Sequence, residues 1–459
     1  MPELRPIPPR RTGPERLTVA TVWSRLASVG ALCLVLCLWA QAALAGGELV
    51  FGMSAAFSGP ARGLGMEYHR GLLAAFEQVN AQGGAGGWRL SLSPRDDAYD
   101  PATAMRNTIA FVEQDRVFAL LGYVGTPTTA RVLPLVRHYR TSSMLLLFPL
   151  TGADMLRSQA NRQGVYNLRA SYLEETHNLV AALYASGRRR MAVFHQADVY
   201  GRNGWDGVRR ALAARGLRIV SEATYRRGAG FGQDFRREVE MIRKGRPDAV
   251  VTVGTAPACA AFVRDLRGAG YSGVAATLSF ADADNIARFL LSQEKQSRRN
   301  LLSGLVFSQA VPCYEDARLP AARAYREAMS RLKATRPPQL TPDEYVPHRL
   351  SFVGFEGFLA GMALSEAVAR MGDAPSRQRL REAFLSLGPV DLGLDAKVDL
   401  RSGPGQGLRR TYLTVFQDGR FKGVDCIDPK LAWRGPVPVP HLAGGDARSA
   451  AHPGQGATR

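Results

Sequence analysis

From residue 47 onwards, short runs rich in β-branched and aromatic residues alternate with amphipathic stretches of helical length. This alternation predicts parallel β-sheets that are covered by helices on both faces. It occurs twice, over residues 48–168 and 171–308, so the sequence predicts an α/β protein with two doubly wound lobes. The expected strands include 48–53, 88–93, 117–121, 144–148, 191–195, 217–223 and 249–253, and the expected helices include 100–114, 126–139, 201–215, 231–244 and 257–268.

The last third of the chain breaks this alternation. After an expected strand at 304–308, the pattern predicts helices near 318–334, 349–371 and 376–387. A β-hairpin follows, with strands at 412–416 and 420–424 and a turn at Asp418-Gly419, a pair that strongly favours such turns. We therefore expect the chain to return to the first lobe through the helices and to end in the second lobe through the hairpin.

The first 45 residues have the three parts of a secretory signal peptide. Five arginines lie among the first 25 residues, an uncharged stretch runs from Leu26 to Gly47, and Ala43-Leu44-Ala45 has the pattern of a cleavage site. A membrane anchor is the alternative, but the apolar core is shorter than the roughly 20 residues that span a bilayer. We expect residues 1–45 to be removed on export to the periplasm, and the Pro-, Gly- and Ala-rich tail at 431–459 to be disordered.

The formal net charge of +19 is compatible with nucleic-acid binding. However, the basic residues are scattered, six of the 59 are lysine, and the longest run is Arg188-Arg189-Arg190. No aromatic residues are interleaved with them. This pattern is typical of a solvated basic surface, so nucleic acid is not an expected partner.

The loops after the expected strands are the candidate binding segments, because ligands of open α/β sheets bind beyond the carboxyl ends of the strands. These loops are rich in Gly, Ser and Thr and poor in His, Cys and Lys; they are residues 54–65, 122–126, 149–152, 196–200, 254–257 and 279–281. Their hydroxyls and backbone N–H groups suit a carboxylate or another polar head group.

No catalytic constellation or metal motif emerges from the sequence. The acidic run at 96–100 is read as a turn and a helix cap, and His195 with Asp198 lacks a nucleophile or a third group. Cys259 lies among alanines, which is typical of a helix packed on a sheet. We therefore expect no enzymatic activity, no cofactor and no metal.

A series of short motifs occurs in a defined order: Ser58-Gly59-Pro60, Gly65-Met66-Glu67-Tyr68, Asn80-Ala81-Gln82-Gly83-Gly84, Asp96-Asp97, Gly122-Tyr123-Val124-Gly125-Thr126, Pro149-Leu150-Thr151-Gly152, Asn167-Leu168-Arg169, Tyr200-Gly201 and Asp248-Ala249-Val250. Their order and spacing resemble the leucine/isoleucine/valine-binding family of type I periplasmic binding proteins. The resemblance covers roughly residues 48–424. It implies lobes joined by three crossings, near 169–171, 308–312 and 405–410, with lobe 1 at 46–169 and 312–406 and lobe 2 at 170–311 and 407–430.

The resemblance also implies which residues bind ligand. Thr126 and the loop at 150–152 match groups that hold the ligand head group, and Leu64 matches an apolar or aromatic contact. The full expected set is Ser58, Leu64, Tyr123, Thr126, Leu150, Thr151, Gly152, Tyr200, Thr255 and Phe280.

Two positions depart from the amino-acid binders of that family. Phe280 lies near the position of an acidic residue that holds the substrate ammonium, and Thr255 or Ala256 replaces an aromatic contact. These departures favour a neutral compound, or a carboxylic acid without an amine, over a leucine-like substrate.

A disulfide is expected from the implied arrangement. Cys313 follows the second crossing, and Cys426 follows the hairpin, which belongs near that crossing. Export permits disulfides. We therefore expect Cys313 and Cys426 to pair and Cys259 to remain free and buried.

The expected function is capture of a small amino-acid-like, carboxylate or amide compound in a cleft between the lobes. The chain would be the monomeric, extracytoplasmic component of an ATP-driven (ABC) importer, with the inner-membrane permease and ATPase complex as its partner. A ligand-sensing module for a receptor or kinase is the first alternative, since the same fold would serve. An exported α/β enzyme is the second alternative, which the missing nucleophile–base pair argues against.

Overall fold

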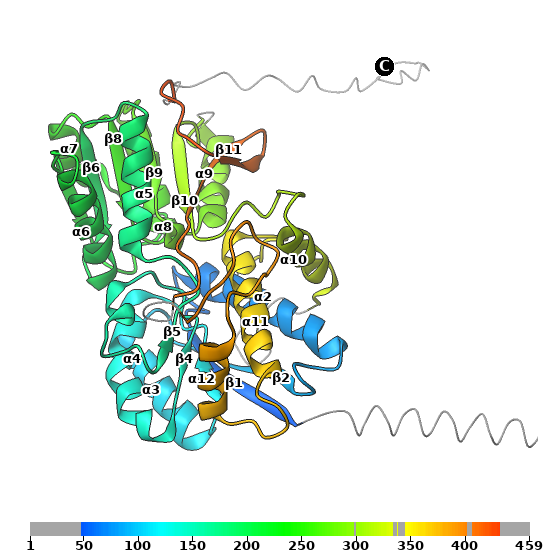
Figure 1. Cartoon of the computed structure of the whole chain (residues 1–459). Coiled ribbons are helices and arrows are strands. Elements are labelled where there is room, and N and C mark those ends of the chain that lie inside the picture. Colours follow the sequence, from blue (N-terminus) through cyan, green and yellow to red (C-terminus); the bar gives the residue numbers. More distant parts are fainter. Residues whose placement is uncertain (1–46, 298–299, 334–336, 338–344, 402–405, 432–459) are drawn as a thin grey trace, which may run out of the picture.

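The fold consists of two α/β lobes, one above the other in Figure 1. The computed structural model describes residues 47–297, 300–333, 337, 345–401 and 406–431. The expected signal peptide, residues 1–45, and the expected C-terminal tail after Leu431 lie outside these residues. Each lobe is built on its own sheet, so the predicted fold class is confirmed.

Lobe 1 contains a parallel five-stranded sheet with the order β2-β1-β3-β4-β5. The short central strands β3 and β4 are fully buried, as expected for a parallel sheet covered on both faces. The strands are β1 (Glu48–Ala55), β2 (Arg89–Asp96), β3 (Ala119–Leu121), β4 (Leu146–Leu147) and β5 (Val165–Tyr166).

The helices of lobe 1 come from two distant parts of the chain. The first part supplies α2 (Arg62–Ala81), α3 (Pro101–Ile109) and α4 (Thr126–His138), and the last third adds α10 (Pro320–Arg331), α11 (Phe352–Ala369) and α12 (Arg377–Ser386). Figure 1 shows α11 (yellow) beside α2 (blue). The two backbones touch, since a Cβ atom on Gly71 would lie 2.0 Å from the carbonyl oxygen of Gly354.

Helix α11 has the length and apolar composition of a membrane span, the only such helix among the described residues. However, 83% of it is buried inside lobe 1, as the core helix of an α/β lobe would be.

Lobe 2 contains a seven-stranded sheet with the order β12-β11-β10-β9-β8-β6-β7. β11 pairs antiparallel with β10 and β12, and the other strands are parallel. The strands are β6 (Met191–Gln196), β7 (Glu222–Tyr225), β8 (Ala249–Val253), β9 (Val274–Thr277), β10 (Leu305–Gln309), β11 (Tyr412–Gln417) and β12 (Arg420–Val424), and the helices are α5 (Tyr172–Ala185), α6 (Val199–Ala213), α7 (Arg236–Lys244), α8 (Ala256–Gly268) and α9 (Ala283–Ser297).

The chain passes between the lobes three times: between β5 and α5, between β10 and α10, and before β11. Two of these crossings are tied together, since Gly407 N donates to Asn167 O at 2.8 Å and Leu408 N to Leu168 O at 2.7 Å. Loops that follow strands of the two sheets meet between the lobes, since Tyr99 after β2 lies beside Phe280 after β9.

Candidate functional site between the lobes

A pair of hydroxyls lies at the inner end of the cleft, on lobe 1. The loops after β3 and β4 are joined by a hydrogen bond from Leu150 N to Tyr123 O at 2.7 Å. This places Thr126, the first residue of α4, beside Thr151, with 2.7 Å between the two Oγ1 atoms. We call Thr126, Thr151 and the adjacent Tyr172 the inner hydroxyl cluster. The N-terminus of α4 adds a partial positive charge there.

Four aromatic side chains lead outward from this cluster. The ring centroids of Tyr172 and Tyr200 are 5.3 Å apart, those of Tyr200 and Phe280 are 4.8 Å apart, and those of Phe280 and Tyr99 are 6.2 Å apart. Tyr99 belongs to lobe 1, whereas Tyr200 and Phe280 belong to lobe 2. We call this set the aromatic chain; it closes the inner part of the cleft.

Two hydroxyls of the aromatic chain have no hydrogen-bond partner among the described residues. They are Tyr99 Oη and Tyr172 Oη, and both are buried. Burial raises the pKa of both phenols, so they remain protonated donors. Tyr99 is also held at a φ of 63°, in the left-handed region that few non-glycine residues adopt. Unpartnered buried donors and backbone strain of this kind concentrate at binding sites.

A pocket of about 630 Å³ lies further out, and we call it the outer pocket. Its walls come from both lobes, at the starts of α2 and α8 and along α9. The lining residues are Gly59, Pro60, Ala61, Arg62, Gly63, Leu64, Gly230, Phe231, Thr255, Ala256, Pro257, Asp282, Asn285, Arg288, Phe289, Tyr345 and Val346. A volume of this size accommodates a small organic molecule.

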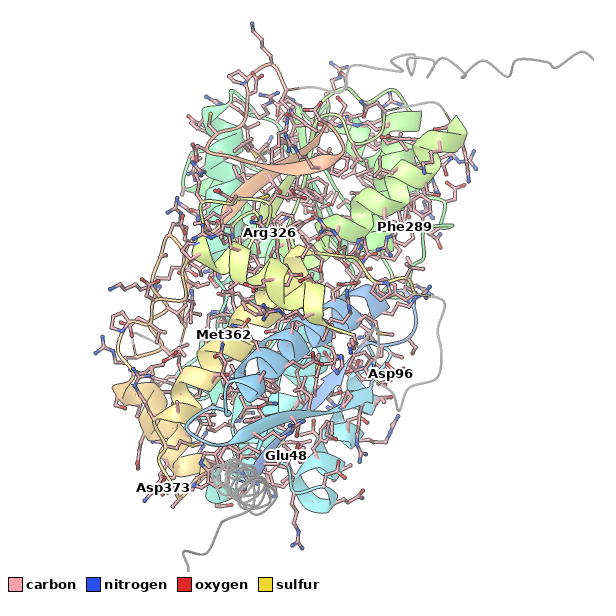
Figure 2. The ribbon with its side chains drawn as sticks, turned by 90° about the vertical axis from the view of Figure 1, so that its right-hand side faces the viewer. Glu48, Asp96, Phe289, Arg326, Met362 and Asp373 are labelled. Atoms are coloured by element: carbon pink, nitrogen blue, oxygen red, sulfur yellow. The ribbon has the colours of Figure 1, made fainter. Side chains whose placement is uncertain are left out.

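The outer pocket and the aromatic chain are neighbours. Tyr99 lines a smaller pocket of about 140 Å³ together with Pro60, Ala61 and Thr255, and these three also line the outer pocket. Figure 2 shows both lobes from the side, with Phe289 on the upper lobe and Asp96, which precedes the Tyr99 loop, on the lower lobe.

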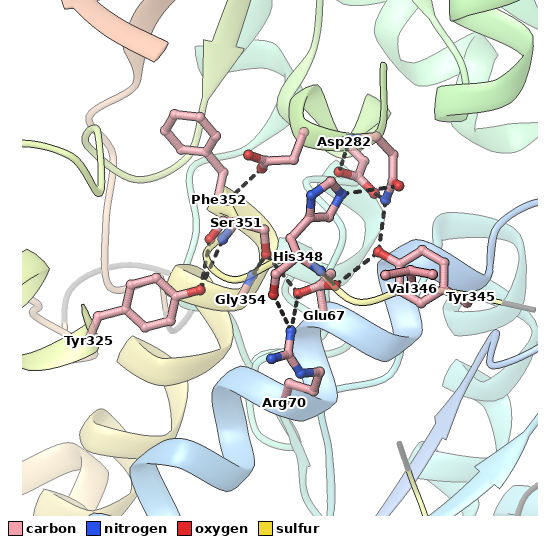
Figure 3. A network of polar contacts seen from close by, with 12 residues as sticks. Glu67, Arg70, Asp282, Tyr325, Tyr345, Val346, His348, Ser351, Phe352 and Gly354 are labelled. Carbon is pink, nitrogen blue, oxygen red and sulfur yellow. Dashed lines mark hydrogen bonds and ion pairs between the residues drawn. The ribbon is translucent and has the colours of Figure 1, made fainter. Parts of the chain in front are cut away.

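A polar network joins the lobes beside the outer pocket (Figure 3). Glu67 on α2 accepts hydrogen bonds from Tyr345 Oη at 2.9 Å, His348 N at 2.8 Å and Ser351 Oγ at 3.1 Å. Asn285 of lobe 2 donates to Tyr345 Oη at 3.2 Å. Asp284, also of lobe 2, accepts from Phe352 N at 2.8 Å. We call these contacts the interlobe network; they connect lobe 1 to lobe 2.

Arg169 makes a second connection, in the first crossing. Its buried guanidinium lies 3.6 Å from Glu356 Oε1 on α11 and donates to Ser279 Oγ of lobe 2. Ser279 is fixed in turn by Glu175, which accepts from its backbone N at 2.6 Å. One arginine therefore connects the crossing to both lobes.

The sequence-predicted site residues fall into three groups. Thr126, Leu150, Thr151, Gly152, Tyr200 and Phe280 belong to the inner hydroxyl cluster, to its loop or to the aromatic chain, and Leu64 and Thr255 line the outer pocket. The remaining two bond elsewhere: Ser58 donates to Asp96, and the Tyr123 hydroxyl lies 2.9 Å from Thr108 Oγ1 inside lobe 1.

Sequence reasoning missed the residues that complete the cleft. They are Tyr99, Arg169, Tyr172, Phe231, Arg288, Phe289 and Tyr345. Arg169 is the last residue of the motif 167–169, and Tyr172 lies three residues further on. An arginine and an aromatic residue at an expected lobe crossing were the available signal.

The predicted disulfide is not formed. Cys259, Cys313 and Cys426 are all free thiols; Cys313 is buried, whereas Cys426 is exposed. The Cys313 thiol instead donates to Phe421 O at 3.6 Å. The hairpin does lie beside the second crossing, but the two sulfurs occupy environments of different exposure.

The residues considered for catalysis have structural roles. Asp198 caps α6 by accepting from Tyr200 N at 3.0 Å and Gly201 N at 3.2 Å. Burial raises the pKa of the Cys259 thiol to about 12, so it remains protonated. Within the described part of the chain, no group of three or more His, Cys, Asp or Glu side chains is arranged to hold a metal.

Comparison with known proteins agrees with this architecture. Residues 48–420 match the family described as periplasmic binding protein. A solved structure of a possible leucine/isoleucine/valine-binding protein from Rhodopirellula baltica is 31% identical, with a TM-score of 0.72 over 84% of this chain and 98% of that one.

Two curated relatives match over about half of the chain. An amino acid binding protein of Pseudomonas aeruginosa is 26% identical over 227 residues, 49% of this chain and 58% of the relative. The Leu/Ile/Val-binding protein of Escherichia coli is 26% identical over 221 residues, 47% of this chain and 57% of the relative. Because the family match extends over most of the chain, the protein belongs to the periplasmic binding protein family.

Proposed function

We propose that this chain captures a small organic solute in the cleft between its lobes, as the extracytoplasmic component of an ATP-driven importer. Its partner would be an inner-membrane permease and ATPase complex, and residues 1–45 would direct export. The names of the curated relatives, which refer to amino acid binding, support a solute of similar size.

One observation carries the proposal: the walls of the cleft come from both lobes. Leu64 of lobe 1 and Ala256 of lobe 2 line the same outer pocket. A solute in that pocket contacts both lobes only when they are closed, so binding and closure are coupled. The buried donors Tyr99 Oη and Tyr172 Oη would serve the polar part of the solute.

The departures from the amino-acid binders support a solute without an ammonium group. Phe280 is fully buried against Tyr200 and Tyr99, and it offers no charge to a cation. A carboxylate or amide head group would instead meet the hydroxyls of Thr126 and Thr151 and the N-terminus of α4.

Native mass spectrometry tests this proposal. The full chain is produced with residues 1–45 in a Gram-negative host, purified from the periplasm without refolding, and compared with the same sample after unfolding and refolding. We expect a small organic molecule bound to the first sample and absent from the second. A protein that converts the bound compound to a product, or that carries none and binds no solute in calorimetry, would contradict the proposal.

A further inference from the structure

The outer pocket has mainly apolar walls. On lobe 2, the rings of Phe231 and Phe289 stack with centroids 5.0 Å apart. On lobe 1, Pro60 and Leu64 line the opposite side. Val346 stands at the rim with 74% of its surface exposed, one of the few large hydrophobic residues so exposed among those described. Apolar surface left open around a pocket marks a place where an apolar body binds.

Arg288 places a positive charge on the wall of the pocket. The other charged lining residues are Arg62 and Asp282. Both oxygens of Asp282 accept hydrogen bonds from Asn285, from its backbone N at 3.2 Å and from Nδ2 at 2.5 Å. Helices α2 and α8 also begin at the pocket, and their N-termini add partial positive charge.

Arg288 is a cation of the pocket wall with unused hydrogen-bond donors. Its guanidinium lies over the Tyr345 ring, 5.4 Å from the centroid, and Nη1 donates to Val346 O at 2.5 Å. It forms no ion pair within the described part of the chain. A guanidinium has five N–H donors in a fork that matches a carboxylate. These contacts hold Arg288 at the pocket wall while leaving most of its donors unused.

The inner hydroxyl cluster and the outer pocket lie on one path. Phe280 and Tyr99 separate them, and these two rings belong to different lobes. Opening the lobes would part the rings and connect the two spaces. A solute that enters the open cleft and stays there as the lobes close would keep these rings apart and would reach from the hydroxyls of Thr126 and Thr151 to the outer pocket.

We propose that the solute is an extended organic anion: its apolar body lies in the outer pocket, its anionic group pairs with Arg288, and its other, polar end reaches the inner hydroxyl cluster. This inference rests on the proposed function and specifies the class of solute. It excludes free leucine, isoleucine and valine as the preferred solutes, since their charged groups are all at one end and cannot reach both Arg288 and the inner hydroxyl cluster.

The test uses two matched series of probes, linear α,ω-dicarboxylates and monocarboxylates of six to ten carbons. Calorimetry measures each against the wild type, Arg288→Gln, Arg288→Lys and the control Arg237→Gln, which removes an exposed arginine of α7 outside the pocket. In the wild type and the control, at least one dicarboxylate should bind about ten- to a hundredfold more tightly than the monocarboxylate of equal length.

Arg288→Gln should abolish this advantage, whereas Arg288→Lys should retain part of it. Thermal unfolding verifies that each variant is folded. Equal binding of the two series to the wild type, an advantage that survives in Arg288→Gln, or failure of every dicarboxylate to bind would overturn the inference. A co-purified neutral compound or a branched-chain amino acid would also overturn it, while leaving the proposed capture of a solute intact.

A second pair of series, built on a benzene ring, distinguishes an aromatic from an aliphatic body of the solute.

Discussion

At the scale of single residues, Thr126 is the position where the proposed head group can be tested. Its hydroxyl lies at the start of α4, 2.7 Å from Thr151 Oγ1. A hydrogen bond to a charged group contributes about 1.5–3 kcal/mol. Thr126→Val should therefore weaken binding of a carboxylate head group by roughly ten- to a hundredfold in calorimetry.

The matched control is Thr224→Val, which makes the same change at an exposed position on β7. It should bind as the wild type does. If Thr126→Val also binds like the wild type, the head group lies elsewhere in the cleft and the assignment of the inner hydroxyl cluster fails.

Whether a site residue could be predicted from the sequence depended on what fixes its position in the fold. Thr126 and Thr151 lie in the loops after two predicted strands, so the ends of β3 and β4 fix their place at the edge of the sheet of lobe 1. Tyr99 was missed because the acidic residues around it explain its segment as a turn and a helix cap, and Asp100 does cap α3. Arg288 was missed because α9 as a whole was not predicted, and because the pocket exists only when two lobes meet.

At the scale of elements, the same distinction holds. The hairpin β11–β12 was predicted to within a residue, since its turn and its alternation are local properties. A strand was expected at 217–223, but β7 begins at Glu222, because only that part pairs with β6. The two-residue strand β5 was not predicted, as it is defined by its neighbour β4 rather than by its own composition.

The contact of α9 with lobe 1 predicts a dependence of stability on pH. Asp284 at the start of α9 is buried between the lobes, where it accepts from Tyr314 Oη at 2.7 Å and Phe352 N at 2.8 Å. Burial, then the nearby charges of Asp282 and Glu67, raise its pKa to about 8. An unfolded aspartate has a pKa of about 3.9. Between these values the folded protein holds a proton that the unfolded chain has lost, so stability falls as pH rises through 8.

Thermal unfolding between pH 5 and pH 8.5 should show this effect. The melting temperature of the wild type should fall over that range by about 2 °C or more beyond that of Asp284→Asn, the shift expected in a protein of this size for a loss of about 1–2 kcal/mol. Asp373→Asn, at an exposed position, serves as the control and should follow the wild type. Parallel curves for wild type and Asp284→Asn would show that Asp284 does not carry a proton in the folded state.

At the scale of the whole molecule, the two lobes are connected by contacts between side chains of different lobes. The aromatic chain and the interlobe network both join residues of different lobes. Without a solute, the greater conformational entropy of an open state opposes these contacts. We expect small-angle scattering to show a larger radius of gyration for the solute-free protein than for the saturated one. An unchanged radius of gyration at saturation would contradict coupling between binding and hinge closure.

The pairing of α11 with α2 has a consequence for how the chain acquires its structure. Ser351 and Glu67 are hydrogen-bonded although 284 positions separate them, and Val306 of β10 pairs with Val415 of β11. Neither core is therefore complete until nearly the whole chain has been synthesised. Folding slows as contacts become more distant in sequence. A newly made chain would thus remain unfolded while it is still being synthesised. An unfolded chain is what a transport channel for unfolded polypeptides accepts.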